Sequence, residues 1–133
     1  MKRFYSIQKE LAIAGVPKRI LRSQEARGLI NIMGENENIL GCVQGLYTEG
    51  IGLVVATNSR LLIINKSFLW TKMEDESYAM VNSILYKKGL IFGKLTLATR
   101  ARRYVFNVLV KDPVESFIVI LDSKMRQHSQ ARL

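Results

Sequence analysis

The 133-residue chain has few of the side chains on which most catalytic and metal sites depend. It has one cysteine, Cys42, and one histidine, His128. A single cysteine cannot form an intrachain disulfide, and without a cluster of Cys and His the donor set of a zinc site is missing. Cys42 lies in an apolar context typical of a buried, inert thiol, and His128 falls in a polar tail that we expect to fray. We therefore predict that the chain is not an enzyme and holds no metal or cofactor.

Prolines and long apolar runs are also scarce. With only two prolines and no Ser/Gly-rich stretch, no linker divides the chain. Apolar runs such as residues 61–64 are far too short to span a bilayer. Lys2 and Arg3 begin the chain as in a signal peptide, but the polar residues 8–10 interrupt the apolar segment. We expect a cytoplasmic protein, which could also be peripheral at the inner face of the membrane.

What the chain does have is enough apolar material for one folded domain, since 48% of its residues are hydrophobic. At the N-terminus, Phe4, Ile7, Leu11 and Ala14 follow the spacing of one helix face. Gly15-Val16-Pro17 then separates that helix from a second, weaker helical pattern. Residues 1–33 are therefore predicted to form an N-terminal helical extension.

After residue 34 the apolar period becomes that of strands. We expect seven strands, at residues 39–47, 51–57, 60–66, 68–77, 83–88, 95–98 and 104–110. Asn58-Ser59 suits a tight hairpin connection between the second and third. The third is apolar on both faces at residues 61–64, so both faces should be covered, by the N-terminal helices or by another subunit.

A C-terminal amphipathic helix follows the strands. Asp112 can cap it, Pro113 occupies its first position, and Glu115 completes an arrangement like a capping box. An apolar stripe then runs along one face, at Val114, Phe117, Ile118, Leu121 and Met125. Such a helix needs an apolar surface to cover, and the open end of a small barrel provides one. Residues 127–133 are expected to be a polar tail.

Seven strands followed by one such helix resemble the pleckstrin-homology (PH) fold. Local features resemble the bacterial PH domain family, and in particular its YokE-like group. These features are Glu37-Asn38-Ile39-Leu40, Thr57-Asn58-Ser59-Arg60-Leu61 and segments 78–84, 89–96 and 117–121. The resemblance covers about residues 35–123. It implies an α+β fold, mainly β: a seven-stranded PH-like barrel or sandwich at residues 34–126, capped by the C-terminal helix and preceded by the N-terminal extension.

The resemblance also implies a non-catalytic domain that contacts lipids, peptides or copies of itself. PH domains that hold phosphoinositides typically carry basic residues between the first and second strands. Here that connection is Tyr47-Thr48-Glu49-Gly50, which has an acid and no cation. Phosphoinositide binding is therefore not carried over to these positions.

Positive charge concentrates in one part of the chain. The net charge is +9, and residues 77–111 include seven basic and no acidic side chains. Such segregation favours an anionic partner, although a merely solvated basic face is the simpler alternative. The candidate binding residues are Arg100, Arg102, Arg103, Lys87, Lys88 and Lys94. The arginines come first because they are contiguous, whereas the antiparallel topology could place Lys94 on a different rim from the others.

Two other motifs have simpler structural explanations. Side chains alternate between the two faces of a strand, so Glu74, Asp75 and Glu76 cannot all converge on one site. We expect their charges to protect an exposed strand edge from aggregation. Segment 89–94 lacks the spacing of a phosphate-binding loop, because three residues separate its glycines and Leu95 follows Lys94. We expect a turn there, with the glycines in unusual backbone conformations.

Three functions compete. Protein–protein contact, self-association included, ranks first because of the two-faced apolar strand. Peripheral binding to anionic membrane lipids ranks a close second. Nucleic-acid binding ranks third, since Tyr104 and Phe106 alternate on a strand and are expected in the core rather than on a stacking surface. No small-molecule substrate is predicted.

Overall fold

The structure, a computed structural model, describes residues 9, 28–29, 32–47, 50–66, 71–109 and 114–131. Most of the predicted N-terminal extension lies outside these residues, as does the predicted helix cap at Asp112 and Pro113.

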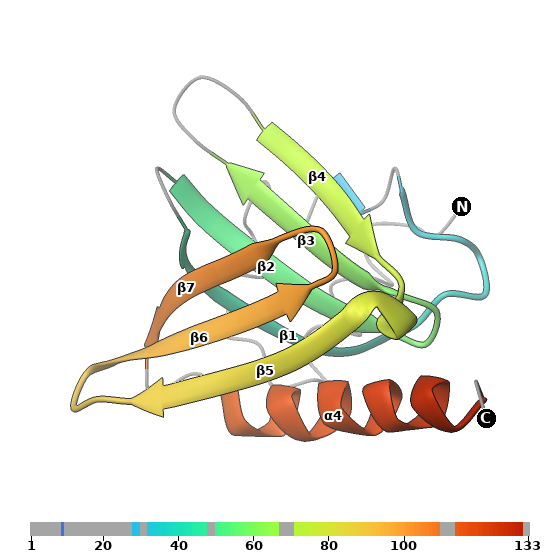
Figure 1. Cartoon of the computed structure of the whole chain (residues 1–133). Helices are drawn as coiled ribbons and strands as arrows, with labels where there is room; N and C mark the ends of the chain where they lie inside the picture. The colour runs from blue at the N-terminus through green and yellow to red at the C-terminus, as the bar shows by residue number, and fades with distance from the viewer. Residues whose placement is uncertain are drawn as a thin grey trace.

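Seven antiparallel strands form one curled sheet, and a helix follows them (Figure 1). The strands are β1 (Ile39–Tyr47), β2 (Gly50–Thr57), β3 (Leu61–Lys66), β4 (Thr71–Glu76), β5 (Val81–Lys88), β6 (Phe92–Thr99) and β7 (Arg103–Leu109). A 3-10 helix, η1 (Tyr78–Met80), joins β4 to β5, and α4 (Val114–Ala131) ends the described chain. The order across the sheet is β4-β3-β2-β1-β7-β6-β5. This arrangement confirms the predicted seven strands and C-terminal helix.

The sheet curls at β1, which is shared by its two halves. β1 pairs with β2 from Ile39 to Tyr47, but it pairs with β7 only from Gly45 to Tyr47. The crossing is close at Gly45, where a Cβ atom would lie 2.8 Å from Val108 Cγ1 and 2.9 Å from the carbonyl oxygen of Asn107. Glycine allows the two strands to approach at this point.

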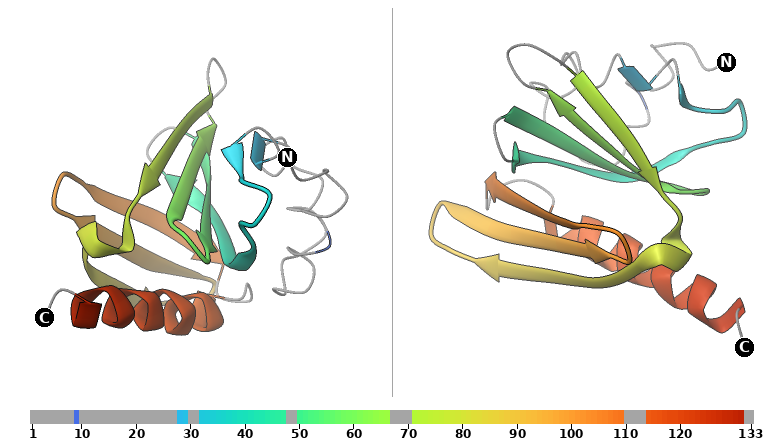
Figure 2. Two further views of the ribbon diagram at one scale, coloured as in Figure 1. Left: turned by 90° about the vertical axis from the view of Figure 1, so that its right-hand side faces the viewer. Right: turned by 45° about the horizontal axis from the view of Figure 1, so that its top comes forward.

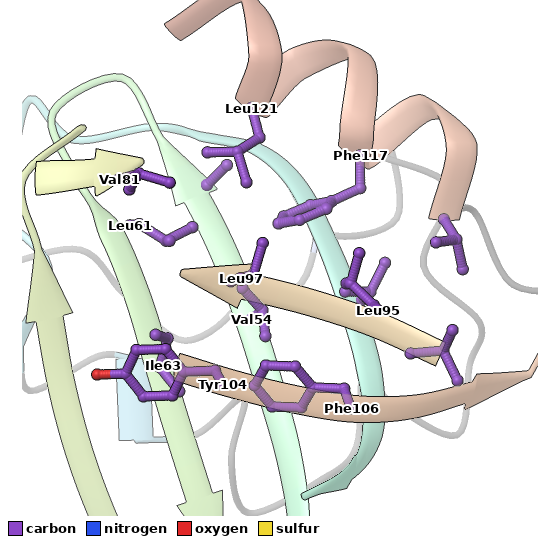
Figure 3. Packing of buried hydrophobic residues seen from close by; sticks show 14 of the residues in the cluster. Val54, Leu61, Ile63, Val81, Leu95, Leu97, Tyr104, Phe106, Phe117 and Leu121 are labelled. Carbon is purple, nitrogen blue, oxygen red and sulfur yellow. The ribbon is translucent and has the colours of Figure 1, made fainter. Parts of the chain in front are cut away.

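The concave side of the sheet holds the main core. Side chains from both halves meet there: Val54, Leu61, Ile63, Leu95, Leu97, Tyr104 and Phe106 (Figure 3). The predicted stripe of α4 closes one open end, with Phe117 and Leu121 each at most 1% exposed (Figures 1 and 3). The inward-facing residues of the strands and the apolar stripe of α4 therefore pack into one cluster.

A second apolar cluster covers the convex side of β1, β2 and β3. Leu62 and Ile64 point into it, together with Leu53, Val55 and Cys42. Leu29 and Met33, which precede the sheet in sequence, complete the cluster and are 0% and 4% exposed. The two-faced burial predicted for β3 is confirmed. The cover comes from the same chain, so this strand requires no partner subunit.

The α-helix is longer than the polar composition of its end indicates. α4 continues to Ala131, and His128 lies on it with its ring centroid 5.5 Å from that of Tyr78. The expectation of a frayed tail at His128 is therefore wrong. Tyr78 is itself anchored, since its hydroxyl donates a hydrogen bond to the Thr57 carbonyl at 2.5 Å, and the helix gains an aromatic contact near its end.

Candidate anion-binding surface

Three of the predicted basic residues gather at one end of the sheet. In the β5–β6 ladder, Lys87 is paired with Lys94 and Lys88 with Gly93, immediately before the turn at residues 89–91. All three lysines are exposed, and Lys88 forms an ion pair at 3.6 Å with Glu115 at the start of α4. We call Lys87, Lys88 and Lys94 the lysine cluster. The expected separation of Lys94 from the other two is wrong, because antiparallel pairing brings the two ends of one hairpin together.

The arginines lie elsewhere. Arg100 and Arg102 belong to the turn between β6 and β7, which is at the opposite end of β6 from the lysine cluster. Arg100 is exposed, whereas Arg102 forms an ion pair with Glu74. Arg100 and Arg102 therefore do not share the end of the sheet that carries the lysine cluster.

Arg103 is the exception among the arginines, because it points outward from the first position of β7. A shallow cleft of about 370 Å³ lies along the outer face of β5, β6 and β7. Its lining includes Lys87, Lys94 and Arg103, with the hydroxyl groups of Ser83 and Thr96 between them. Ammonium, guanidinium and hydroxyl groups are the donors that phosphate oxygens accept.

The hairpin beside the lysine cluster carries a feature that the sequence reasoning missed. We call Leu90, Ile91 and Phe92 the hairpin tip; they are 100%, 68% and 54% exposed. The sequence signal is three consecutive apolar residues between two glycines, a pattern that also suits an ordinary turn. Figure 1 shows the hairpin extending beyond the rest of the sheet at this end.

The flanking glycines are needed for space. Neither Gly89 nor Gly93 has a φ in the left-handed region, so the expectation that these glycines provide such a conformation is wrong. A Cβ atom on Gly93 would lie 2.5 Å from Tyr86 Cε1, and one on Gly89 would lie 2.3 Å from the Phe92 carbonyl oxygen. The hairpin closes tightly because these two positions lack side chains.

The acidic segment of β4 occupies a free edge of the sheet, as predicted, and its side chains alternate. Asp75 faces outward and binds Arg60 at 3.0 Å. Glu74 and Glu76 face inward, where the Tyr104 hydroxyl donates to Glu74 and lies 3.0 Å from Glu76 Oε1. Burial, together with these two carboxylates, raises the pKa of Tyr104. The cluster joins the edge strand to β7 across the concave side and is best explained as structural.

Cys42, Tyr104 and Phe106 lie in the two apolar clusters. Cys42 is 1% exposed, and burial raises the pKa of its thiol. Tyr104 and Phe106 are core residues, as predicted. Within the described residues no group of His, Cys, Asp and Glu is arranged to hold a metal ion. No helix in this part of the chain has the length and apolar character needed to cross a membrane.

The curled seven-stranded sheet with a helix across its open end defines a PH-like domain. A family model described as "Bacterial PH domain" matches residues 33–123, and the chain belongs to that family. No curated protein matches the chain.

Two solved structures have the same fold. A pleckstrin homology domain from Shewanella amazonensis SB2B superposes with a TM-score of 0.60 at 17% identity, covering 78% of this chain and 97% of that one. A DUF1696 family protein with a pleckstrin-homology domain from Shewanella loihica PV-4 gives a TM-score of 0.54 at 19% identity, covering 77% and 94%. Domains of this fold are generally non-catalytic binding modules that contact proteins or lipids.

Proposed function

We propose that the chain is a non-catalytic binding module that attaches to anionic membrane surfaces through the lysine cluster and Arg103. The observation that carries this proposal is the convergence of Lys87, Lys88 and Lys94 on one end of the β5–β6 hairpin. Residues 77–111 contribute no carboxylate, and Glu115 of α4 forms an ion pair with Lys88 at 3.6 Å. Lipid phosphate and carboxylate groups are suited to such a surface.

Two features of the structure favour a membrane over a protein or a nucleic acid as the partner. The strongest sequence argument for a protein partner was the two-faced apolar β3, and Leu29 and Met33 of the same chain cover it. A single-stranded nucleic acid would need several exposed stacking aromatics, but Tyr104 and Phe106 are in the core and, among the described residues, only Phe92 has an exposed ring. We therefore rank lipid contact ahead of protein contact, which reverses the order derived from the sequence.

The strength of this attachment can be estimated from the charges. Each basic side chain near an anionic leaflet contributes about 1 kcal/mol, so three lysines and Arg103 together give about 4 kcal/mol. That free energy corresponds to a Kd of about 1 mM. Binding by charge alone should accordingly be weak and should decrease as the salt concentration rises.

Flotation with liposomes tests the proposal. The full chain should float with phosphatidylcholine–phosphatidylserine vesicles at moderate salt and not with phosphatidylcholine alone. K87E/K94E should abolish flotation, while R100E/R126E, with the same charge change at exposed positions outside the lysine cluster, should retain most of it. Absence of flotation with either lipid composition, or equal loss in both variants, would contradict the proposed surface.

Self-association is the second candidate function, with another copy of this chain as the partner. It is favoured by an apolar cleft of about 280 Å³ lined by Leu46, Ile51, Phe92 and Leu109, among other residues. Leu46 is 55% and Ile51 is 44% exposed, so both side chains are available for contact. Sedimentation velocity over a range of concentrations tests this candidate, and a monomer at all concentrations would exclude it.

We retain two finer assignments as proposals. One is the YokE-like group within the bacterial PH family, supported by the Thr57-Asn58-Ser59-Arg60-Leu61 hairpin. The other is a location at the inner face of the membrane, which follows from the lipid contact proposed above. Fluorescence microscopy of the tagged chain, with K87E/K94E for comparison, tests the location.

A further inference from the structure

We propose that the hairpin tip, Leu90, Ile91 and Phe92, inserts into the boundary between head groups and acyl chains of an anionic bilayer. This inference rests on the proposed membrane attachment and adds the part of the molecule that enters the apolar phase. The lysine cluster would remain among the head groups.

The exposure of the tip is unusual within the described part of the chain. Leu90 is 100% exposed, and it is followed directly by Ile91 and Phe92 at 68% and 54%. Elsewhere the exposed large apolar side chains are not consecutive: Leu46, Ile51, Met73, Met80, Leu85 and Val119. Three adjacent apolar side chains on a turn therefore remain in water in this structure, which is unfavourable unless a partner removes them from it.

The shape of the tip favours a bilayer as that partner. The tip belongs to a protruding hairpin, which Figure 2 shows extending away from the body of the sheet in a second view. A bilayer accepts a protruding wedge without a preformed groove, because its head groups move aside. A protein partner would need an apolar groove with an acidic rim.

The position of the charges fits the depth of insertion. Lys94 is two residues along β6 from Phe92, an axial distance of about 7 Å for extended backbone. Apolar faces of interfacial segments enter membranes by roughly 5–10 Å. Lys87 is paired with Lys94 and lies at the same level. Inserting the tip would consequently bring both ammonium groups to the phosphate layer, where long side chains can extend toward water.

Insertion would also add the free energy of transferring apolar side chains out of water, which the charges do not provide. Electrostatic attraction from the lysine cluster and Arg103 supports only weak attachment. Transfer of leucine and isoleucine side chains from water into an apolar phase is favourable, and salt does not screen it as it screens charge attraction. A chain bound by both contributions should therefore retain part of its vesicle affinity at high salt, whereas a chain bound by charge alone should lose it.

A fluorescent label on the tip tests the insertion directly. Leu90→Cys can be labelled selectively, because the only native cysteine, Cys42, is 1% exposed. An environment-sensitive dye at this position should shift to shorter wavelength on phosphatidylcholine–phosphatidylserine vesicles and be quenched by acyl-chain nitroxides. The same dye on Ser123→Cys, an exposed position of α4, should do neither. A tip dye that stays in a water-like environment while the protein floats would overturn the inference.

A second experiment avoids the label. L90S/I91S should lower the vesicle partition coefficient by roughly tenfold or more, since two exposed apolar groups lose their transfer free energy. Val119→Ser is the matched control, because Val119 on α4 is as exposed as Ile91, and its partition coefficient should be unchanged. Thermal unfolding should show that both variants fold as the wild type does.

The possible results separate the two proposals. If the wild type does not bind anionic vesicles, the proposed membrane attachment fails and the insertion fails with it. If the wild type binds and L90S/I91S binds equally well, only the insertion fails. If L90S/I91S instead abolishes a self-association seen without lipid and leaves vesicle binding unchanged, the tip is a protein contact and the insertion is also overturned.

Discussion

The carboxylate of Glu37 lies at the centre of the contacts that join residues 32–37 to the turn between β2 and β3. Its Oε2 atom accepts from Thr57 Oγ1 at 2.6 Å and from Arg60 Nε at 3.0 Å. Its Oε1 atom accepts from Arg60 Nη2 at 3.1 Å and from the Gly34 backbone N–H at 3.2 Å. Glu37 is only 5% exposed, so water cannot replace these partners readily.

Glu37→Gln should destabilise the fold by about 2–3 kcal/mol. The substitution keeps the shape but removes the charge, and it turns an amide toward the Arg60 donors. Loss of one partner from a fully buried pair costs about 3–5 kcal/mol, and we expect a smaller loss here because the Arg60 side chain is 29% exposed. In a domain of this size, 2 kcal/mol lowers Tm by roughly 5–10 °C.

Urea unfolding followed by circular dichroism measures the effect, and two variants control for other causes. Asp75 is the outer partner of Arg60, and the Asp75 side chain is 62% exposed, so Asp75→Asn should change the stability by less than about 0.5 kcal/mol. The double variant E37Q/R60M leaves no unpaired guanidinium and should be more stable than the sum of the single effects predicts. An E37Q protein as stable as the wild type would refute the reasoning.

The pairing of Glu37 with Arg60 also predicts that the stability of the fold depends on pH. Burial by itself would raise the pKa of Glu37, but hydrogen bonds from Arg60, Thr57 and Gly34 outweigh it and hold the pKa below its ordinary value of 4.5. The unfolded chain therefore binds this proton more readily than the folded chain does. The contribution is fully present above the ordinary pKa and is lost as the pH falls through the folded pKa. The stability difference between wild type and E37Q should accordingly shrink below about pH 4.5, and a difference independent of pH would contradict this assignment.

Two further substitutions test the packing. Gly45→Ala should lower the free energy of unfolding by about 1–3 kcal/mol, because its Cβ atom would press on Val108 and on a backbone carbonyl oxygen where β1 crosses β7. Urea unfolding measures this loss. Gly34→Ala is the control and should be nearly neutral, because the nearest atom to its Cβ would be 4.0 Å away. Phe117→Ala should lower the free energy of unfolding by about 3–5 kcal/mol, because the Phe117 ring on the inner face of α4 is 1% exposed. Val119→Ala, on the exposed face of the same helix, should leave the urea midpoint nearly unchanged. A small loss for Phe117→Ala would show that α4 does not close the core.

Strand and helix positions follow mainly from local patterns, and their ends follow from pairing. β1 and β2 lie close to their predicted positions because the alternation there is strong and the turn residues are clear. β6 begins at Phe92 rather than at Leu95. The earlier start reflects the ladder with β7, in which Phe92 is paired with Leu109. Pairing with a neighbouring strand sets this end, so the local pattern of β6 alone could not give it.

For the candidate anion-binding surface too, the sequence indicates some features and the structure alone shows others. The sequence identified Lys87, Lys88 and Lys94, because a basic stretch without acids is visible in composition. It could not show that these residues share one end of the sheet, because that depends on the β5–β6 register. The sequence shows the hairpin tip as three consecutive apolar residues between two glycines, but only the packed structure shows that their side chains are exposed.

By itself, the sequence determined the elements and their order, since apolar periods of two and of 3.6 residues act over short distances along the chain. The tertiary structure alone decided which residues became neighbours. It joined Glu37 to Arg60 and Glu74 to Tyr104, it separated Arg100 and Arg102 from the lysine cluster, and it left Leu90 in solvent. These outcomes depend on strand register and on the curling of the sheet at Gly45, which arise only when segments distant in sequence pack together.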